Sequence, residues 1–222
     1  MNRLIRKLLF PLPYVVRWYL SRERTYQYKD LSIVVLPGVF HPGLFFSTNM
    51  LLEFISRQSL AGLKVLEVGA GTGIISLLAG RMGAEVTATD ISSVAIENIR
   101  RNALKNNAQF TIIQSDLFER VRLHKYDWII VNPPYYPRNP KKEEDYAWHC
   151  GEQYEYFEKF FAGVLAYLSD RGQIIMVLSD VCDLVTIKRI GKENGFEFVI
   201  VLEQEVWLDG KNYIFRVNPV ML

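Results

Sequence analysis

Residues 65–73 read Val-Leu-Glu-Val-Gly-Ala-Gly-Thr-Gly, an apolar strand that runs directly into a glycine-rich turn. From Lys64 onward, segments typical of strands alternate with segments typical of helices. The strand segments, such as Trp128–Val131, are continuously apolar, as expected when helices cover both faces of a sheet. The sequence therefore predicts an α/β fold with an open, mostly parallel sheet.

The predicted elements extend outward from this stretch. Strands are predicted at 64–69, 85–89, 110–114, 126–131 and 172–179, and helices at 73–82, 92–106, 152–168 and 183–194. The segments 196–206 and 211–218 predict a closing antiparallel hairpin, which completes a seven-stranded sheet. Upstream, 31–36 predicts a strand and 49–58 a helix, whereas 1–30 predicts short, basic, aromatic-rich helices broken at Pro11 and Pro13.

Composition indicates a folded globular chain. Half of the 222 residues are hydrophobic. The formal net charge is only +2, so the overall charge of the chain does not indicate nucleic-acid binding. Basic residues concentrate in residues 1–30, which could contact RNA, an acidic protein or a membrane surface. The two cysteines and three histidines show no zinc-binding spacing, so no metal site is predicted.

The first residues imitate a signal peptide. Basic residues precede an apolar run over 8–16, but Pro11 and Pro13 interrupt the run and no small-residue cleavage site follows. No apolar run reaches the ~20 residues that a membrane span needs. We expect a cytoplasmic protein.

The glycine turn predicts a cofactor site, since glycine lets the backbone turn tightly and lets a ligand approach closely. The three glycines are Gly69, Gly71 and Gly73. A dinucleotide fingerprint would need a glycine where Ile74 stands, and a phosphate loop would need Gly-Lys-Ser/Thr, which is absent. The turn therefore disfavours NAD, FAD and ATP.

Carboxylates at strand ends complete the predicted cofactor site, because open parallel sheets bind ligands at the carboxyl ends of their strands. Asp90 closes the second strand and could accept hydrogen bonds from two ribose hydroxyls. Asp116, past the third strand with Leu117 beside it, could accept from an adenine amino group or could cap a helix. Glu67 could face a methionine-like end or be an ordinary strand residue.

Asn132-Pro133-Pro134-Tyr135 follows the apolar strand at 126–131 and predicts the reaction site. An amide or aromatic amino nitrogen is a poor nucleophile because its lone pair is delocalised. Two acceptors that bind its N–H groups direct the lone pair toward a methyl group. The Asn132 side-chain oxygen and the Pro133 carbonyl suit this task, and Tyr135 suits contact with a flat group. The alternative is an ordinary proline-rich loop.

Over residues ~31–222 the chain resembles class I S-adenosylmethionine-dependent methyltransferases. Glu67–Gly73 matches their first motif, and Asp90 and Asp116 match their ribose and adenine positions. Asn132–Tyr135 is similar to the amino-methylating subgroup, in which this motif marks the target-nitrogen pocket. The resemblance implies S-adenosylmethionine as the cofactor. It also implies two parts: a basic helical and strand extension over 1–60 that covers the cofactor site, and an S-adenosylmethionine-binding domain over 61–222.

Two further stretches resemble glutamine methyltransferases of the HemK/PrmC type. Val39–Gly43 through Ser47-Thr48 is similar to the segment that closes over the cofactor in that branch. Ala147–Glu152 is similar to its Ala-x-x-Gly-Gly region, with Cys150 in place of the first glycine. This likeness implies N5-methylation of a glutamine in a release-factor-like protein.

Two other functions stay open at this point. One is methylation of an exocyclic amine of adenine or guanine in tRNA or rRNA, because the amino-methylating motif is shared with such enzymes. Basic residues over 3–29 and the Tyr and Trp residues over 135–156 are suited to bind RNA and to stack on bases. The other is a non-catalytic RNA-binding protein on a methyltransferase fold, since a fold does not guarantee its usual activity.

Overall fold

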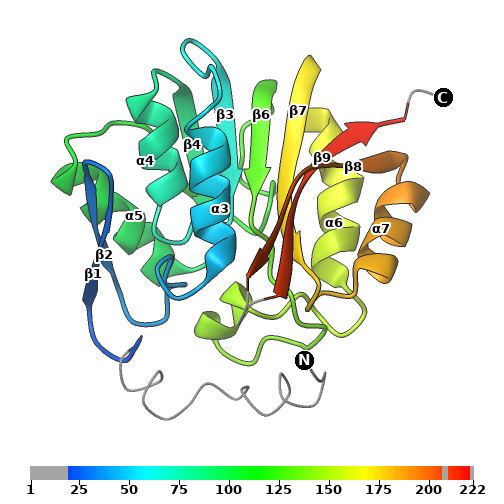
Figure 1. Ribbon diagram of the computed structural model, residues 1–222, viewed down its shortest axis with the longest axis horizontal. Coiled ribbons are helices and arrows are strands. Elements are labelled where there is room, and N and C mark those ends of the chain that lie inside the picture. The colour runs from blue at the N-terminus through cyan, green and yellow to red at the C-terminus, as the bar shows by residue number, and fades with distance from the viewer. Residues whose placement is uncertain (1–19, 207–209, 221–222) are drawn as a thin grey trace.

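The computed structural model describes residues 20–206 and 210–220 of the chain. A seven-stranded sheet forms its centre, and a separate two-stranded hairpin lies beside it (Figure 1). The strands are β1 Arg24–Tyr28, β2 Leu31–Val35, β3 Lys64–Val68, β4 Glu85–Asp90, β5 Thr111–Gln114, β6 Tyr126–Val131, β7 Leu168–Ser179, β8 Phe196–Val206 and β9 Gly210–Pro219. The helices are α3 Phe46–Ile55, α4 Ile74–Arg81, α5 Ser93–Lys105, α6 Glu155–Val164 and α7 Leu184–Glu193, with short 3-10 turns η1 Glu143–Ala147 and η2 Leu165–Tyr167.

The strand order is β5-β4-β3-β6-β7-β9-β8. The first five of these strands run parallel, and β9 pairs antiparallel with both β7 and β8. This order confirms the predicted mostly parallel sheet with a C-terminal hairpin. It brings the carboxyl ends of β3, β4, β5 and β6 to one edge of the sheet, the lower edge in Figure 1, where ligands of such sheets bind.

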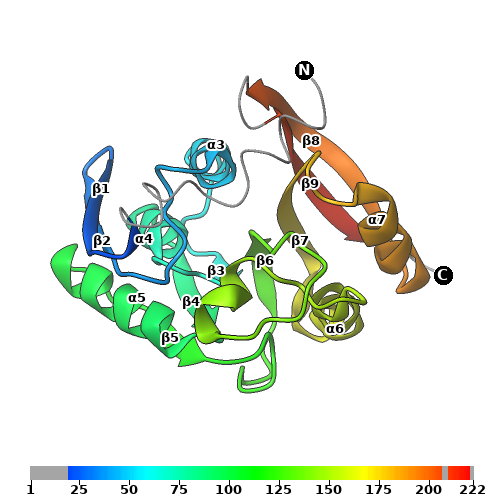
Figure 2. The ribbon, with the colours of Figure 1, turned by 90° about the horizontal axis from the view of Figure 1, so that it is seen from below.

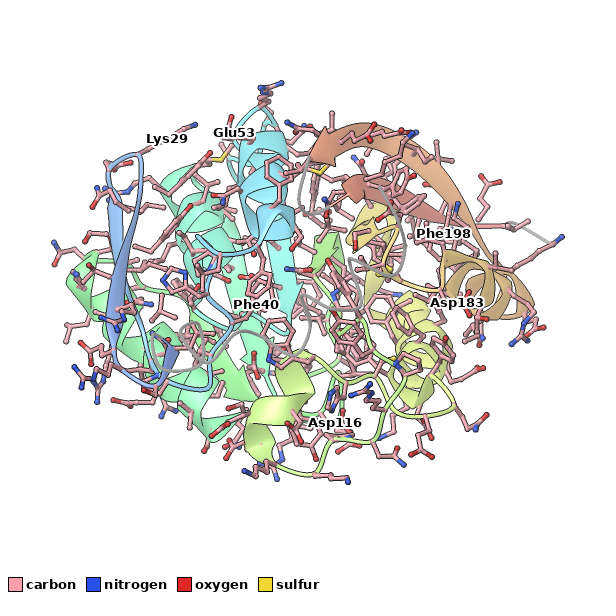
Figure 3. The ribbon with its side chains drawn as sticks, turned by 60° about the horizontal axis from the view of Figure 1, so that its bottom comes forward. Lys29, Phe40, Glu53, Asp116, Asp183 and Phe198 are labelled. Atoms are coloured by element: carbon pink, nitrogen blue, oxygen red, sulfur yellow. The ribbon has the colours of Figure 1, made fainter. Side chains whose placement is uncertain are left out.

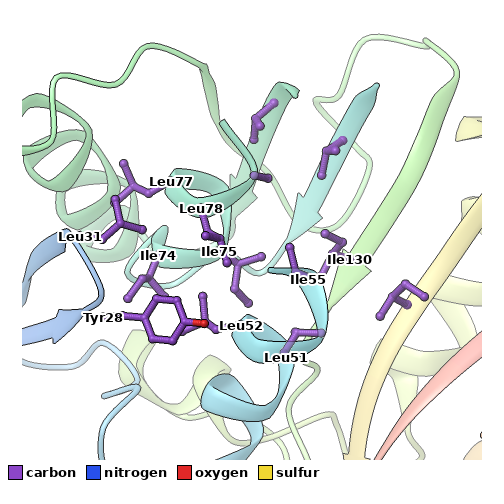
Figure 4. Close-up of a cluster of buried hydrophobic side chains, with 14 of the residues drawn as sticks. Tyr28, Leu31, Leu51, Leu52, Ile55, Ile74, Ile75, Leu77, Leu78 and Ile130 are labelled. Carbon is purple, nitrogen blue, oxygen red and sulfur yellow. The ribbon is translucent and has the colours of Figure 1, made fainter. Parts of the chain in front are cut away.

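Successive residues of the central strands face opposite layers of the core, as the pleat of a strand requires. Val65, Ile130 and Val177 pack with α3 and α4 on one face. Leu66, Ile129 and Met176 pack with α6 and α7 on the other face. Figure 4 shows the first layer, in which Tyr28 and Leu31 of the β1–β2 hairpin join side chains of α3, α4 and β6.

Three asparagines, two in α5 and one directly after its last residue, hold the β1–β2 hairpin against the core. The Oδ1 atoms of Asn98, Asn102 and Asn106 accept from the backbone N–H groups of Leu36, Val34 and Ser32, at 2.9, 2.7 and 3.2 Å. The asparagines are four residues apart along the helix, a rise of ~6 Å, and their backbone partners are two residues apart along the strand, a rise of ~6.6 Å. The two spacings nearly match, so each asparagine lies beside its partner. The asparagine amides therefore bond the backbone along the edge of β2 that does not pair with β1, in the place that a neighbouring strand would take. Figure 2 shows α5 beside β2.

The structure corrects two sequence predictions. Residues 24–28 were predicted to be helical but form β1, because Thr-Tyr-Gln-Tyr alternates in exposure and pairs with β2. The predicted helix at 152–168 is shorter: α6 covers Glu155–Val164 and β7 begins at Leu168. The predicted breaks at Pro11 and Pro13 lie outside the described residues. Within the described residues, no helix is long and apolar enough to cross a membrane.

Candidate active site

A cavity of about 330 Å³ opens at the carboxyl ends of the parallel strands. Nine of the ten predicted site residues line it: Glu67, Gly69, Gly71, Asp90, Asp116, Leu117, Asn132, Pro133 and Tyr135. Figure 3 tilts this edge of the molecule toward the reader, with Phe40 near its centre and Asp116 below. The fold thus brings together side chains that lie up to 68 positions apart in the sequence, because four strands end at the same edge.

The tenth residue, Gly73, does not line the cavity. It precedes α4 with φ +74°, and a Cβ there would lie 3.0 Å from the Ile99 side chain of α5. Glycine is therefore required at this position for close helix packing. Gly69 also has a positive φ, +72°, but a Cβ there would meet no protein atom within 4 Å. Its open side is where a ligand could approach the backbone.

Both carboxylate oxygens of Asp90 accept hydrogen bonds from the backbone. Its Oδ2 accepts from the Gly71 N–H at 2.8 Å, and its Oδ1 accepts from the Ser92 N–H at 2.9 Å. Burial raises the pKa of this carboxyl, while those two N–H groups oppose the shift. Each carboxylate oxygen has a further lone pair, so Asp90 can accept two more hydrogen bonds from a ligand.

Glu67 is buried inside the protein, with only 4% of its surface exposed. Its Oε2 accepts from the Ser76 N–H at 2.8 Å and from the Ser76 hydroxyl, near the start of α4. Burial raises the pKa of Glu67 to about 8 despite these hydrogen bonds. Glu67 is therefore part of the cavity floor and not an exposed strand residue.

Asp116 and Leu117 form the far end of the cavity. Asp116 accepts from the ammonium group of Lys159 at 2.8 Å, an ion pair between partly exposed side chains. Leu117 is buried with φ +49°, an unusual conformation for a residue with a side chain. This turn aims the backbone at the cavity instead of continuing β5.

Asn132 is held by residues from two other parts of the chain. Its Nδ2 lies 3.4 Å from both the Ser47 Oγ and the Thr48 Oγ1 of α3. Its Oδ1 accepts from the Tyr135 hydroxyl at 2.9 Å. The sequence analysis predicts Asn132 and Tyr135 as site residues, but it names Ser47 and Thr48 only within a segment that resembles the HemK/PrmC branch.

An aromatic cluster lies at one wall of the cavity, which Phe40 and Trp148 line. Phe40, Phe45 and Trp148 have ring centroids 4.4–5.1 Å apart. The sequence suggested Trp148 as a stacking residue but did not single out Phe40 or Phe45 as members of the site. Tyr156, another aromatic residue near the motif, packs on Phe157 and Phe160 of its own helix.

The cavity fits S-adenosylmethionine in the chemistry of its walls. The bare backbone at Gly69 leaves room for a ligand, and Asp90 offers acceptors for hydroxyl groups. Apolar side chains, including Val68, Ile91 and Leu117, line the rest of the cavity and suit a flat adenine ring.

The model of the methyltransferase small domain family matches residues 30–193. A Methanocaldococcus jannaschii protein, named provisionally as a protein N5-glutamine methyltransferase, is 34% identical over 156 residues, which cover 68% of this chain and 76% of that protein. The ribosomal RNA small subunit methyltransferase C of Haemophilus influenzae is 39% identical over 119 residues, which cover 51% of this chain and 35% of that protein. The chain thus spans about a third of the length of this curated relative.

A solved structure has the same fold. The T. thermophilus 16S rRNA N2 G1207 methyltransferase, in complex with AdoMet and guanosine, superposes with a TM-score of 0.63 at 19% identity. The match covers 90% of this chain and 50% of that one. The family match and the fold confirm the resemblance that the sequence motifs carry. The chain belongs to the methyltransferase small domain family and is a methyltransferase that uses S-adenosylmethionine.

Proposed function

We propose that this protein methylates a planar amino nitrogen, the side-chain amide of a glutamine in a release-factor-like protein. The observation that carries the proposal is the fixed amide of Asn132 in the wall of the cavity. Its Oδ1 has a second lone pair beyond the one that Tyr135 occupies, and this lone pair can accept an N–H of the acceptor group. The Pro133 carbonyl is the second acceptor, and the Tyr135 ring contacts the flat face.

The residues act mainly by orientation. Two N–H groups held by Asn132 and Pro133 turn the nitrogen lone pair toward the methyl group, which lowers the entropic barrier. Bound S-adenosylmethionine would supply the activated methyl group, with the nitrogen–carbon bond forming as the sulfur–carbon bond breaks and S-adenosylhomocysteine leaving. The methylated nitrogen gives up one proton to water, and no covalent enzyme intermediate is needed.

The cofactor contacts follow from the same geometry. Asp90 would hold the ribose hydroxyls, Glu67 and the backbone at Gly69 and Gly71 the methionine end, and Asp116 and Leu117 the adenine. Residues 1–60 would cover the site. Val39, Phe40 and Pro42 from that part of the chain line the cavity, which supports this role.

Similarity to the Methanocaldococcus protein supports glutamine as the acceptor, because it extends over about two thirds of this chain and three quarters of that protein. The ribosomal RNA relative supports a second candidate, an exocyclic amine of a base in RNA. The basic residues suggested for RNA contact lie mostly within 1–19, outside the described residues.

Transfer of tritiated methyl from S-adenosylmethionine to a cell lysate, separated into protein and RNA, tests the proposal. We expect label in protein with the native chain and none with Asn132→Ala. Thermal unfolding of Asn132→Ala should match the native chain, so that loss of label reports chemistry. Label in RNA would replace glutamine with a nucleobase, and undiminished label with Asn132→Ala would overturn the role of Asn132.

A further inference from the structure

Lys159 of α6 contacts the end of the cavity that Asp116 and Leu117 form. Its Nζ donates to the Asp116 Oδ2 at 2.8 Å and lies 3.9 Å from the Glu119 Oε1. Within residues 20–206 and 210–220, no other group donates a hydrogen bond to the Asp116 carboxylate. Lys159 therefore holds one oxygen of this carboxylate, and the other, Oδ1, keeps its lone pairs for a ligand.

The place of Lys159 on α6 brings it to the cofactor end of the cavity. Tyr156 and Lys159 are three residues apart, so they lie on the same face of the helix, and both line the cavity. Burial raises the pKa of the Tyr156 hydroxyl, and the charges of Asp90 and Asp116 raise this pKa further. Tyr156 is therefore close to the two carboxylates expected to hold the ribose and the adenine, and this face of α6 belongs to the same end.

Lys159 also offsets negative charge in the cavity. Among the described residues that line it, Lys159 is the one lysine or arginine, whereas the acidic side chains are Glu67, Asp90, Asp116, Glu143 and Glu155. Like charges repel, so the other carboxylates disfavour an Asp116 carboxylate that faces the cavity. The ammonium group beside Asp116 opposes this repulsion.

The ion pair contributes little to the stability of the fold. The Lys159 side chain is 57% exposed and the Asp116 side chain 33% exposed, and water screens ion pairs of this kind. Its effect is on the direction of the carboxylate, because Asp116 without a partner can turn to water as readily as to the cavity. An acceptor that is already oriented binds a ligand at a smaller cost in entropy.

We propose that Lys159 is a positioning residue for the cofactor: it holds the Asp116 carboxylate so that Oδ1 accepts a hydrogen bond from the amino group of adenine. A site that is built to bind an N–H group rejects an analogue that lacks it. Lys159 therefore increases the preference of the cavity for a cofactor with a 6-amino group. The inference rests on one part of the proposed function, the contact of Asp116 with adenine.

Titration calorimetry with two ligands tests this role. One ligand is S-adenosylhomocysteine, and the other is its 6-H analogue, in which a hydrogen atom replaces the amino group of adenine. With the native chain, Kd of the 6-H analogue should be at least about tenfold higher, since a hydrogen bond to a charged group is lost. In Asp116→Ala, the two Kd values should be nearly equal.

Lys159→Met keeps the aliphatic part of the side chain and removes its charge. We expect the ratio of the two Kd values to fall at least about threefold, a typical coupling between two residues in contact. Lys159→Arg can still pair with Asp116 and should recover most of the native ratio. A residue that only supported the fold would not change this ratio.

Lys211→Met is the matched control. It removes an ammonium group from an ion pair of 2.7 Å with Glu203, which is also partly exposed but lies on the β8–β9 hairpin. Both Kd values should stay native in this variant. Thermal unfolding should show that the Lys159 variants are folded, because their ion pair is partly exposed. If Lys159→Met lost its fold, Lys159→Gln would carry the test.

Each result has one meaning. A lower ratio in Lys159→Met that recovers in Lys159→Arg supports the positioning role. If Asp116→Ala lowers the ratio but Lys159→Met keeps the native value, the inference fails and the adenine contact stands. If Lys159→Met raises both Kd values equally, Lys159 does not act through the amino group, and the inference also fails.

A native ratio in Asp116→Ala would overturn the adenine contact itself, and the inference with it. These titrations contain no methyl acceptor, so their result does not depend on whether the protein methylates glutamine. Label that appears in RNA in the lysate assay would overturn glutamine as the acceptor and leave the role of Lys159 unchanged.

Discussion

The hydroxyl of Tyr135 donates a hydrogen bond of 2.9 Å to the side-chain oxygen of Asn132. The same asparagine contacts Ser47 and Thr48 through its nitrogen, so its amide is held at both ends. A side chain that is already oriented costs little entropy when the acceptor arrives. The Tyr135 hydroxyl is therefore a positioning group for Asn132, in addition to the contact that its ring makes.

Tyr135→Phe tests this relationship, because it removes the hydroxyl and keeps the ring. We expect kcat to fall about tenfold, in line with the loss of one hydrogen bond, with KM for the acceptor little changed. Asn132→Ala should abolish turnover. Tyr28→Phe is the matched control, because it removes a hydroxyl on the β1–β2 hairpin that donates to Glu53 of α3 and does not contact Asn132. A native kcat in Tyr135→Phe would show that Ser47 and Thr48 suffice to orient Asn132.

Asp90 should dominate the affinity for S-adenosylmethionine. Hydrogen bonds to charged groups are worth ~1.5–3 kcal/mol, so Asp90→Ala should raise Kd tenfold or more. Asp90→Asn keeps one side-chain oxygen and should have a smaller effect. Titration calorimetry measures both, with the exposed Asp170→Ala as control. Equal affinity in Asp90→Ala and the native chain would exclude Asp90 as a ribose ligand.

Glu67 should make stability depend on pH. Its pKa is raised in the folded chain from 4.5 to about 8, so the folded state retains a proton that the unfolded state releases. The free energy of unfolding should therefore fall by a few kcal/mol as pH rises from about 5 to about 8. Glu67→Gln should flatten this fall, and the exposed Glu85→Gln should not. Urea unfolding at several pH values measures how steeply the free energy of unfolding falls with pH. The same steepness in Glu67→Gln as in the native chain would mean that other groups cause the fall.

Asn102 should stabilise the hairpin and the glycine turn together. Its amide accepts from the Val34 N–H and donates to the Val34 and Thr72 carbonyls, at 2.7, 2.8 and 2.9 Å. Asn102→Ala leaves three backbone groups without this partner, so we expect destabilisation of at least about 3 kcal/mol. Leu104→Ala on the same helix, where the side chain is 81% exposed, should change stability by under about 0.5 kcal/mol.

Urea unfolding measures these two variants, and calorimetry with S-adenosylmethionine adds a second readout. Because Thr72 belongs to the glycine turn, Asn102→Ala should also weaken cofactor binding, whereas Leu104→Ala should not. Full stability in Asn102→Ala would mean that water replaces the amide at this position.

The sequence predicted most of the fold because the local signals agree with one another. Apolar strands, helical spacing and the glycine turn identified six of the seven sheet strands within a few residues of their ends, and the order of the strands and longer helices was right from Lys64 onward. The boundary between α6 and β7 was the weakest, since Leu165–Arg171 has no proline or other strong stop before Gly172. The strand β1 was missed because its basic flanks obscured a short alternating pattern.

The residues of the candidate site likewise fall into two groups, those that the sequence predicted and those that it did not. Nine predicted residues line one cavity, because each lies at or just past the carboxyl end of a strand and parallel strands of a sheet end at a common edge. Neither the asparagines near α5 nor Ser47 carry a local signal of their roles, since their partners in the core lie 30 or more positions away in the sequence. The sequence by itself determined the fold class and the residues at the strand ends, which depend on nearest neighbours in the chain. Only the tertiary structure decided which distant side chains orient Asn132 and hold the β1–β2 hairpin, because those contacts depend on how α3 and α5 pack against the rest of the chain.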